Sequence, residues 1–171
     1  MEVMEAILAR RSIRQYSDRA LSAEVIDSVI QAAMAAPSAH NEQPWHFIVI
    51  TDRQVLDAVP RMHPYAQMLN EAPMALCVCA DLNLEAERGS GYWIQDCAAA
   101  TENILLAATG LGLGTCWLGI HPREERKKAL SQLLQLPAHV VPFCLIAVGY
   151  AAESKPPLTR CLTERVHRET W

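Results

Sequence analysis

The 171-residue sequence lacks any apolar run of about 18 residues, the length that a membrane-spanning helix needs. Its first residues, MEVMEAILARR, include early acids and no long apolar centre, so they do not resemble a secretory signal peptide. We therefore expect a cytoplasmic protein with no membrane partner. In that compartment the six cysteines are expected to be reduced and to pack as small buried side chains.

An excess of positive charge is also missing. The 15 lysines and arginines are outnumbered by 19 acidic residues, which gives a net charge of −4. The sequence as a whole therefore has no electrostatic attraction for nucleic acid or for an anionic membrane. We expect no nucleic-acid partner, although a local basic site is compatible with this balance.

Several familiar catalytic patterns are absent. There is no Walker-type phosphate loop, and GLGLG at 110–114 follows a helical pattern, whereas the dinucleotide fingerprint follows a strand. The six histidines are dispersed, and Cys77 and Cys79 have no second pair at zinc spacing, so we predict no metal site. No Ser-His-Asp or Cys-His arrangement can be specified. We therefore assign no catalytic side chain, and expect the chemistry to come from a bound cofactor.

What the sequence does contain is an alternation of amphipathic helices and buried strands. Hydrophobic periodicity and breaker residues predict helices at 2–9, 23–36, 52–59, 91–110 and 123–130, with weak helical character at 66–71. Runs of bulky apolar residues predict strands at 45–51, 74–80, 115–119 and 141–149. This order indicates one domain over residues 1–171, with three layers and a mixed sheet.

The stretch from Gly91 to Gly119 is the centre of the predicted fold. Apolar residues recur at intervals of three and four, and the opposite face is hardly polar, so this helix must be covered nearly all round. We expect a second subunit to complete that cover. The helix is predicted to end at Gly110 in a left-handed conformation. Gly112 and Gly114 follow, and would let the main chain approach a ligand or a partner closely.

Polar residues gather in three segments outside this helix. Arg10, Arg11, Ser12 and Arg14 form a dense cluster of donors that suits phosphate or carboxylate, although the cluster by itself favours a solvated basic turn paired with acids elsewhere. Residues 37–44, PSAHNEQP, form a polar loop between a helix and a strand. The basic tail at 151–171 ends in Trp171 and is expected to pack on a neighbouring subunit. Together, the cluster and the tail suggest a phosphorylated cofactor.

Four motifs in this order resemble the flavin-dependent nitroreductase family: RRSIRQY at 10–16, PSAHNEQPWHF at 37–47, QDCAAATENILLAATGLGLGTCWLG at 95–119 and AVGY at 147–150. The tail ending RVHRETW is similar to that of the compact members. The resemblance implies an α+β fold, with a mixed central β-sheet flanked by helices, in an intertwined homodimer that binds two FMN molecules at its interface. Larger members have a helical insertion and a lysine before the second strand that this sequence lacks, which implies a more open or differently lidded pocket.

The resemblance also implies roles for individual residues. Arg10 and Ser12 would contact the FMN phosphate and ribityl chain, Arg11 would help to hold the phosphate, and Arg14 would lie near the pyrimidine edge. The tail would add Arg160 at the phosphate, assisted by Lys155. Backbone amides near flavin N5 and O4 would come from Cys116, Trp117, Leu118 and Gly119. The other subunit would contribute Pro37, Ser38, Ala39 and Asn41, with Gln43 nearby.

The expected activity is that of an FMN-dependent NAD(P)H oxidoreductase. NADH or NADPH would pass hydride to flavin N5, and a nitroaromatic, quinone or related small oxidant would then take it in a ping-pong cycle. A flavin-binding or flavin-storing protein without useful turnover is the alternative. A dimeric interaction protein that has lost FMN would not need the set Arg10, Ser12, Arg14 and Asn41.

Overall fold

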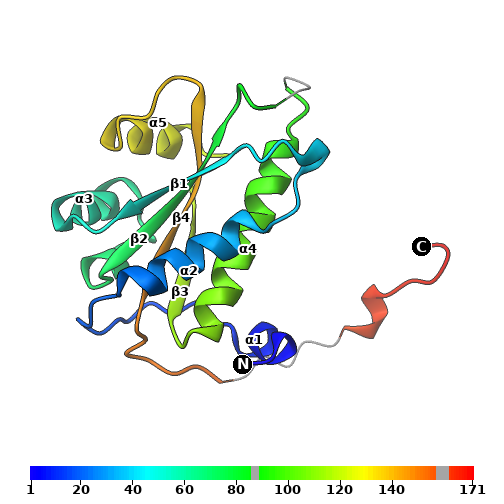
Figure 1. The fold of residues 1–171 in the computed structure, drawn as a ribbon, viewed down its shortest axis with the longest axis horizontal. Helices are drawn as coiled ribbons and strands as arrows, with labels where there is room; N and C mark the ends of the chain where they lie inside the picture. Colours follow the sequence, from blue (N-terminus) through cyan, green and yellow to red (C-terminus); the bar gives the residue numbers. More distant parts are fainter. Residues whose placement is uncertain (86–88, 157–161) are drawn as a thin grey trace.

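The computed structural model describes residues 1–85, 89–156 and 162–171 (Figure 1). Its helices are α1 (Val3–Ala9), α2 (Ala23–Met34), α3 (Arg53–Met62), α4 (Tyr92–Gly110) and α5 (Glu124–Leu133), with short 3-10 turns η1 (Ala39–Asn41), η2 (Gln67–Asn70) and η3 (Thr163–Arg165). Its strands are β1 (Trp45–Ile50), β2 (Met74–Asp81), β3 (Gly114–Gly119) and β4 (Val140–Gly149). Every predicted element is present within a few residues. α3 and α5 each end three residues later than predicted. α3 continues through Pro60, because a proline in the last turn removes a single hydrogen bond.

The four strands form one sheet in the order β1-β2-β4-β3, and every neighbouring pair is antiparallel. The α+β class is therefore confirmed. The mixed character expected of the sheet is confined, within the described ranges, to one parallel bridge between Ser12 and Thr115. β3 lies at the edge of the sheet, so one of its sides is open to other segments.

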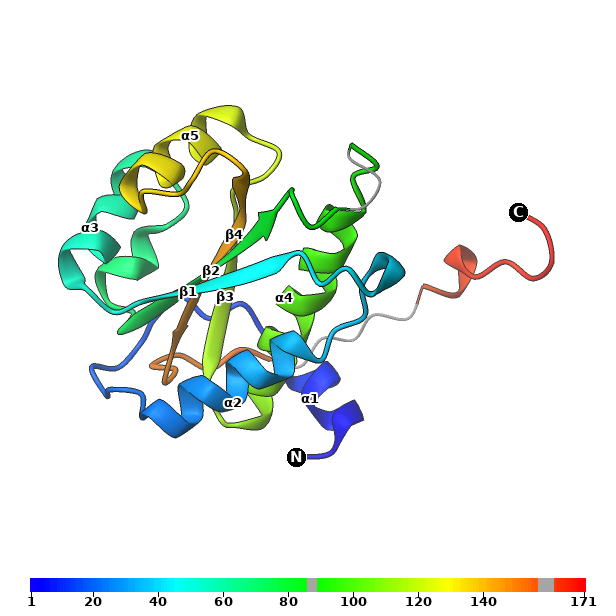
Figure 2. The same ribbon diagram turned by 45° about the horizontal axis from the view of Figure 1, so that its top comes forward.

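Helices cover both faces of this sheet and give the expected three layers (Figures 1 and 2). Alternate strand residues divide between the two cores, as the period of two in a strand requires. Leu76, Val78 and Ile146 pack with α2 and α4, whereas Leu118 and Leu145 pack on the side of α3 and α5. Each face of the central strands is thereby buried.

α4 is buried on more than one of its faces. Trp93, Asp96 and Ala100, on the side opposite the predicted apolar face, are also buried, as expected of a helix covered nearly all round. Trp93 packs on His121 and Phe143, and Asp96 accepts from the Ala39 N–H, whereas α2 packs along another side of α4 (Figure 2). α4 is the longest helix in the described ranges, and none of the helices there is long and apolar enough to cross a membrane.

α4 ends at Gly110, as predicted, but the left-handed residue lies two positions later. Gly112, rather than Gly110, has the left-handed conformation, with φ of 76°. The N–H of Leu113 donates to the carbonyl of Ala108 at 2.8 Å, and that of Gly112 donates to Thr109 at 3.0 Å, which is the Schellman pattern. This turn leads the chain directly into Gly114 and the edge strand β3.

Candidate functional site

Residues 10–16 lie along the open side of β3. The Ile13 N–H donates to the Thr115 carbonyl at 2.8 Å, and Ser12 forms the parallel bridge to the same residue. A Cβ atom at Gly114 would lie 2.8–3.0 Å from the Ile13 side chain, so only glycine permits this approach. The glycine turn therefore brings the basic cluster against the strand that was expected to carry backbone donors.

The chain after β4 holds the other side of this segment. Ser17 donates its N–H to Tyr150 and Ala152 donates to Gln15, both at 2.9 Å. The Tyr16 hydroxyl donates to the Ile13 carbonyl at 2.7 Å, and burial, the largest effect, raises the pKa of Tyr16 far above its ordinary value. Tyr16 consequently stays a neutral donor that fixes the turn.

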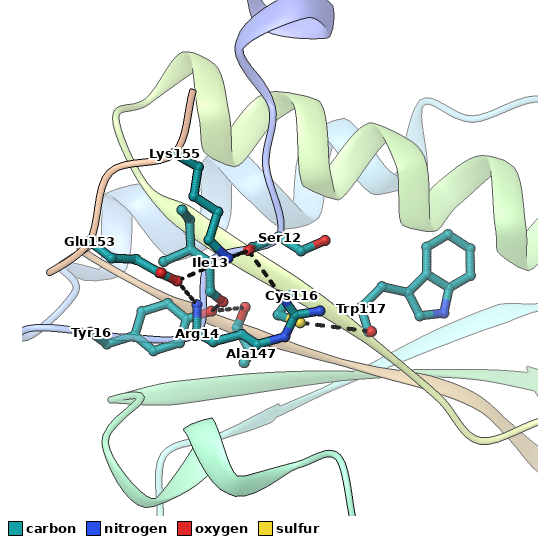
Figure 3. Close-up of polar contacts among 9 residues, drawn as sticks. All are labelled: Ser12, Ile13, Arg14, Tyr16, Cys116, Trp117, Ala147, Glu153 and Lys155. Carbon is teal, nitrogen blue, oxygen red and sulfur yellow. Dashed lines mark hydrogen bonds and ion pairs between the residues drawn. The ribbon is translucent and has the colours of Figure 1, made fainter. Parts of the chain in front are cut away.

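Glu153 and Lys155 complete the set of contacts between residues 10–16 and residues 150–156, which we call the clasp (Figure 3). The Arg14 N–H donates to Glu153 Oε1 at 2.5 Å, and Lys155 Nζ donates to the Ser12 carbonyl at 2.5 Å. The side chains of Lys155 and Glu153 form an ion pair at 3.2 Å. The hydrogen bond from Arg14 is the main reason that the pKa of Glu153 lies below its ordinary value. Lys155 was predicted for the site, whereas Glu153 was not, because an acid in a polar, proline-rich tail carries no distinguishing signal.

The three arginines of the cluster have different environments. Arg11 donates from Nε to the Pro156 carbonyl and from Nη1 to the Leu8 carbonyl, each at 2.8 Å, so it binds the chain itself. Arg10 Nε lies 3.8 Å from Glu102, and the exposed Arg14 approaches only the Ser12 carbonyl, at 3.5 Å. Glu102 is the only carboxylate within 4.0 Å of these three guanidinium groups in the described ranges. A basic turn neutralised by surrounding acids therefore does not account for the cluster.

The open edge of β3 presents main-chain donors beside these cations. In a strand, the N–H and C=O of one residue point to the same side, and successive residues alternate. The carbonyls of Thr115 and Gly119 both point away from β4, since they accept from Ile13 and from Arg126. The N–H groups of Trp117 and Gly119 must therefore face the open edge. Cys116 and Leu118 point their side chains to the α3/α5 face, and the Trp117 ring packs with Phe143 on the other face.

A cavity of about 460 Å³ adjoins this edge. Arg14 and the predicted segment Cys116–Gly119 line one part of it. The opposite part is formed by residues that the sequence did not indicate, namely His63, Tyr65, Gln67, Met68 and Arg126. Burial raises the pKa of Cys116 even though Arg14 opposes this, so the thiol stays protonated and is not a nucleophile. No group of three or more metal-ligating side chains occurs in residues 1–85, 89–156 and 162–171.

His63 and Arg126 converge on the end of β3. His63 Nδ1 lies 3.3 Å from the Tyr65 N–H and accepts from it, so Nε2 carries the proton and donates to the Gly119 carbonyl at 3.0 Å. Arg126 Nη1 donates to the same carbonyl at 2.9 Å. His63 is only 2% exposed, and burial, assisted by the charge of Arg126, lowers its pKa. The imidazole is therefore neutral at pH 7.

This arrangement predicts a loss of stability in mild acid. The pKa of His63 is lower in the folded chain than in the unfolded one, so the unfolded chain binds the proton more tightly. As the pH falls below about 6.5, protonation therefore stabilises the unfolded chain relative to the folded one. Denaturant unfolding between pH 7 and pH 5 should show this decrease. His63→Gln should reduce the slope without abolishing it, because burial also lowers the pKa of His121. The exposed His46→Gln serves as the control, and equal slopes in all three proteins would contradict the assignment.

The loop at 37–43 lies elsewhere in the chain. Figures 1 and 2 place η1 beside the N-terminal half of α4, away from residues 10–16. Asp96 accepts from the Ala39 N–H at 2.9 Å, and its Oδ2 is buried without a partner in the described part of the chain. Burial raises the pKa of Asp96.

Within this loop, side chains and main chain hold a compact turn. Ser38 Oγ accepts from the Gln43 N–H, and Gln43 Nε2 donates to Asn41 Oδ1. Both Asn41 and Gln43 have positive φ. Within a single chain, the predicted loop residues therefore lie away from the basic cluster, namely Pro37, Ser38, Ala39, Asn41 and Gln43. Arg160, the remaining predicted residue, lies outside the described residues.

Comparison with known proteins places this geometry in a family. The model of the nitroreductase family matches residues 7–64 and 58–150. A protein of Methanothermobacter thermautotrophicus, provisionally named NADH dehydrogenase/NAD(P)H nitroreductase, is 49% identical over 173 residues, which cover 100% of this chain and 88% of the relative. A crystal structure of a protein with the same provisional name from Parabacteroides distasonis is 39% identical, with a TM-score of 0.94 over 99% of this chain and 98% of that one.

A further crystal structure shows a nitroreductase-like protein of Desulfovibrio desulfuricans in complex with FMN. It is 33% identical, with a TM-score of 0.83 over 100% of this chain and 98% of that one. These similarities extend over nearly the whole of this chain and of each compared structure. With a family match across most of its residues and a relative 49% identical over its whole length, this chain belongs to the nitroreductase family.

Proposed function

We propose that this protein is an FMN-dependent NAD(P)H oxidoreductase. One observation carries the proposal: the open edge of β3 directs the N–H groups of Trp117 and Gly119 toward a cavity that Arg14 also lines, and Arg10 lies in the same basic segment. Free main-chain donors suit the heteroatoms of a flavin ring, and cations with few acidic partners suit its phosphate. The names of the relatives, which include NAD(P)H nitroreductase and an FMN complex, support the same proposal.

The residues of the basic segment fit this cofactor in a particular order. Arg10 and Ser12, with help from Arg11, would hold the phosphate and ribityl chain, and Arg14 would lie at the pyrimidine edge. In this chain Lys155 orders the binding segment through Ser12 and Glu153, which is a positioning role. Arg160 remains a proposed phosphate contact.

Bound FMN would supply the redox chemistry, taking hydride at N5 from NADH or NADPH and delivering it to a nitroaromatic, quinone or related small oxidant in a ping-pong cycle. The residues around it would contribute orientation and charge. His63 is neutral with its Nε2 proton committed to Gly119, and Cys116 is protonated, so neither offers itself as a base. Solvent can supply the remaining protons.

We further propose that the active form is an intertwined homodimer. Val3, Met4, Ile7 and Leu8 on α1 are 44–70% exposed, which is unusual for the apolar face of an amphipathic helix. Residues 162–171 extend away from the helices and sheet, and Val166 and Trp171 are 70% and 100% exposed (Figure 1). A second copy would cover both surfaces and would bring residues 37–43 to the site, where Asn41 would bond the flavin. Sedimentation should therefore give twice the chain mass, and a monomer would contradict this arrangement.

The visible spectrum of the purified protein tests the enzymatic proposal. A yellow protein whose flavin bleaches on anaerobic addition of NADH or NADPH, and recolours with a quinone, would support it and identify the donor. A yellow protein that neither donor reduces would instead indicate flavin storage. A colourless protein that does not take up added FMN would overturn the site assignment.

Arg14→Ala is expected to lower the midpoint potential of bound flavin by tens of millivolts while leaving much of the binding intact. A cation at the pyrimidine edge favours the negatively charged reduced form, and about 30 mV corresponds to about 1.4 kcal/mol for two electrons. Arg14→Lys should retain most of the potential, because it retains the charge. Arg61→Ala, an exposed change on α3, is the control in a dye-equilibration titration. A potential unchanged by Arg14→Ala would remove Arg14 from this role.

A further inference from the structure

The cavity beside β3 has an unusual charge. Two arginines, Arg14 and Arg126, are among its lining residues, and no aspartate or glutamate is. His63 adds no further positive charge, because burial lowers its pKa and it is neutral at pH 7. In the proposed function Arg14 serves the flavin, which leaves the charge of Arg126 without an assigned purpose.

Arg126 is held in place by neutral groups. Its Nη1 donates to the Gly119 carbonyl at 2.9 Å, and its guanidinium lies over the Tyr65 ring at 6.0 Å from the centroid. His63 Nε2 is 3.2 Å from the same Nη1, but both atoms carry protons, so this contact is not a bond between them. No carboxylate lies within 4.0 Å of Arg126 in the described part of the chain.

A guanidinium has five N–H donors. The contacts above engage Nη1 alone, so most of the donors are uncommitted. A half-buried cation that is fixed by a carbonyl and an aromatic ring, and lines a cavity of about 460 Å³, is ordered before any ligand arrives. Such preorganisation lowers the entropic cost of binding, and the fork of donors matches a carboxylate or a phosphate.

We propose that Arg126, supported by His63 and Tyr65, forms an anion subsite for the small molecules that react at this cavity. The inference deepens the proposed function and rests on it. The anion is either a carboxylate on the oxidant or the 2′-phosphate that distinguishes NADPH from NADH. The two sources share their chemistry and can be separated by experiment.

The test compares Arg126→Gln with wild type. Glutamine can still donate to the Gly119 carbonyl but removes the charge. Arg123→Gln is the matched control, because Arg123 is an exposed arginine at the start of α5 that does not line the cavity. The first measurement needs no turnover. It is a calorimetric titration with benzoate and with benzyl alcohol, of which only benzoate carries a carboxylate. Benzoate binding should weaken about tenfold or more in Arg126→Gln, and benzyl alcohol binding should not change.

Steady-state kinetics then identify the source of the anion. If the oxidant carries it, kcat/KM should fall about tenfold for 4-nitrobenzoate and not for 4-nitrobenzyl alcohol. If the donor carries it, the KM for NADPH should rise much more than that for NADH, and benzoate should then compete with NADPH. Arg126→Lys should recover part of either effect, since it restores charge without the fork.

Other outcomes would overturn the subsite. Equal losses for charged and uncharged ligands would mean that Arg126 only supports the end of β3. Loss of FMN affinity or a shifted flavin potential, without discrimination by ligand charge, would make Arg126 a contact of the cofactor. Wild-type protein that binds benzoate no better than benzyl alcohol would refute the inference even if NADPH reduces its flavin, so this failure is distinct from failure of the proposed function.

Discussion

Arg10→Ala is expected to weaken FMN binding by tenfold to a hundredfold. Arg10 is the member of the cluster best placed to be released for a phosphate, because its one acidic neighbour, Glu102, is 3.8 Å away and half exposed. Hydrogen bonds to charged groups contribute about 1.5–3 kcal/mol, and each 1.4 kcal/mol is a factor of ten in affinity. Fluorescence titration of FMN-free protein with FMN would measure the change.

Glu102→Gln provides the matched control for this prediction. It removes the carboxylate that competes for Arg10, so it should leave FMN affinity unchanged or slightly increased. Riboflavin, which lacks the phosphate, should bind Arg10→Ala and wild type equally well. If Arg10→Ala weakened riboflavin as much as FMN, the arginine would act through the structure of the segment and not through the phosphate.

Gly149→Ala is expected to lower the free energy of unfolding by about 3 kcal/mol. A Cβ atom at this position would lie 2.7 Å from Pro73 Cδ and 2.9 Å from Tyr16 Cδ1. Neither neighbour can yield easily, because one is a ring closed on the backbone and the other is fixed by hydrogen bonds to Ile13 and Ala147. For a chain of this length, the melting temperature should fall by roughly 6–12 °C.

Gly110→Ala is the control, since nothing lies within 4 Å of its Cβ position and its backbone is helical. It should be neutral or stabilising by up to about 1 kcal/mol. Both variants should be melted at one protein concentration, because the proposed dimerisation would make the melting temperature depend on concentration. Gly149→Ala should also weaken FMN binding, since Tyr16 anchors the segment that carries Arg14. A melting temperature within two degrees of wild type would contradict the packing described for Gly149.

The helices and strands could be predicted because their signals are local. Periodicity, prolines and glycines lie within each element, and the basic cluster is contiguous in the sequence. Strand direction was harder: β2 and β4 are buried on both faces, so they have the continuous apolar runs typical of parallel strands, although they pair antiparallel. Three glycines lie at or just after the end of α4, and the sequence alone could not distinguish Gly110 from Gly112 as the left-handed residue.

The residues that escaped prediction act over long separations. Glu153 meets Arg14 from 139 positions away, and His63 meets Gly119 from 56 positions away. No residue near Glu153 or His63 in the sequence indicates which residue either side chain will contact. Arg126 looked like part of a basic, exposed helix face, and its place in the cavity depends on how α5 packs beside β3. Asp96 offered a usable signal, because it is one of only two acids in an otherwise largely apolar helix.

The clasp between residues 10–16 and 150–156 also sets the order in which the protein can mature. Ser12 leaves the ribosome early, but Lys155 and the Ala152 N–H that closes on Gln15 are made 143 and 137 residues after their partners. A nascent chain that has completed α1, α2 and even β3 still lacks the groups that order its basic segment. Cofactor loading should therefore follow synthesis of β4, and ribosome-bound chains that stop before residue 150 should not retain flavin.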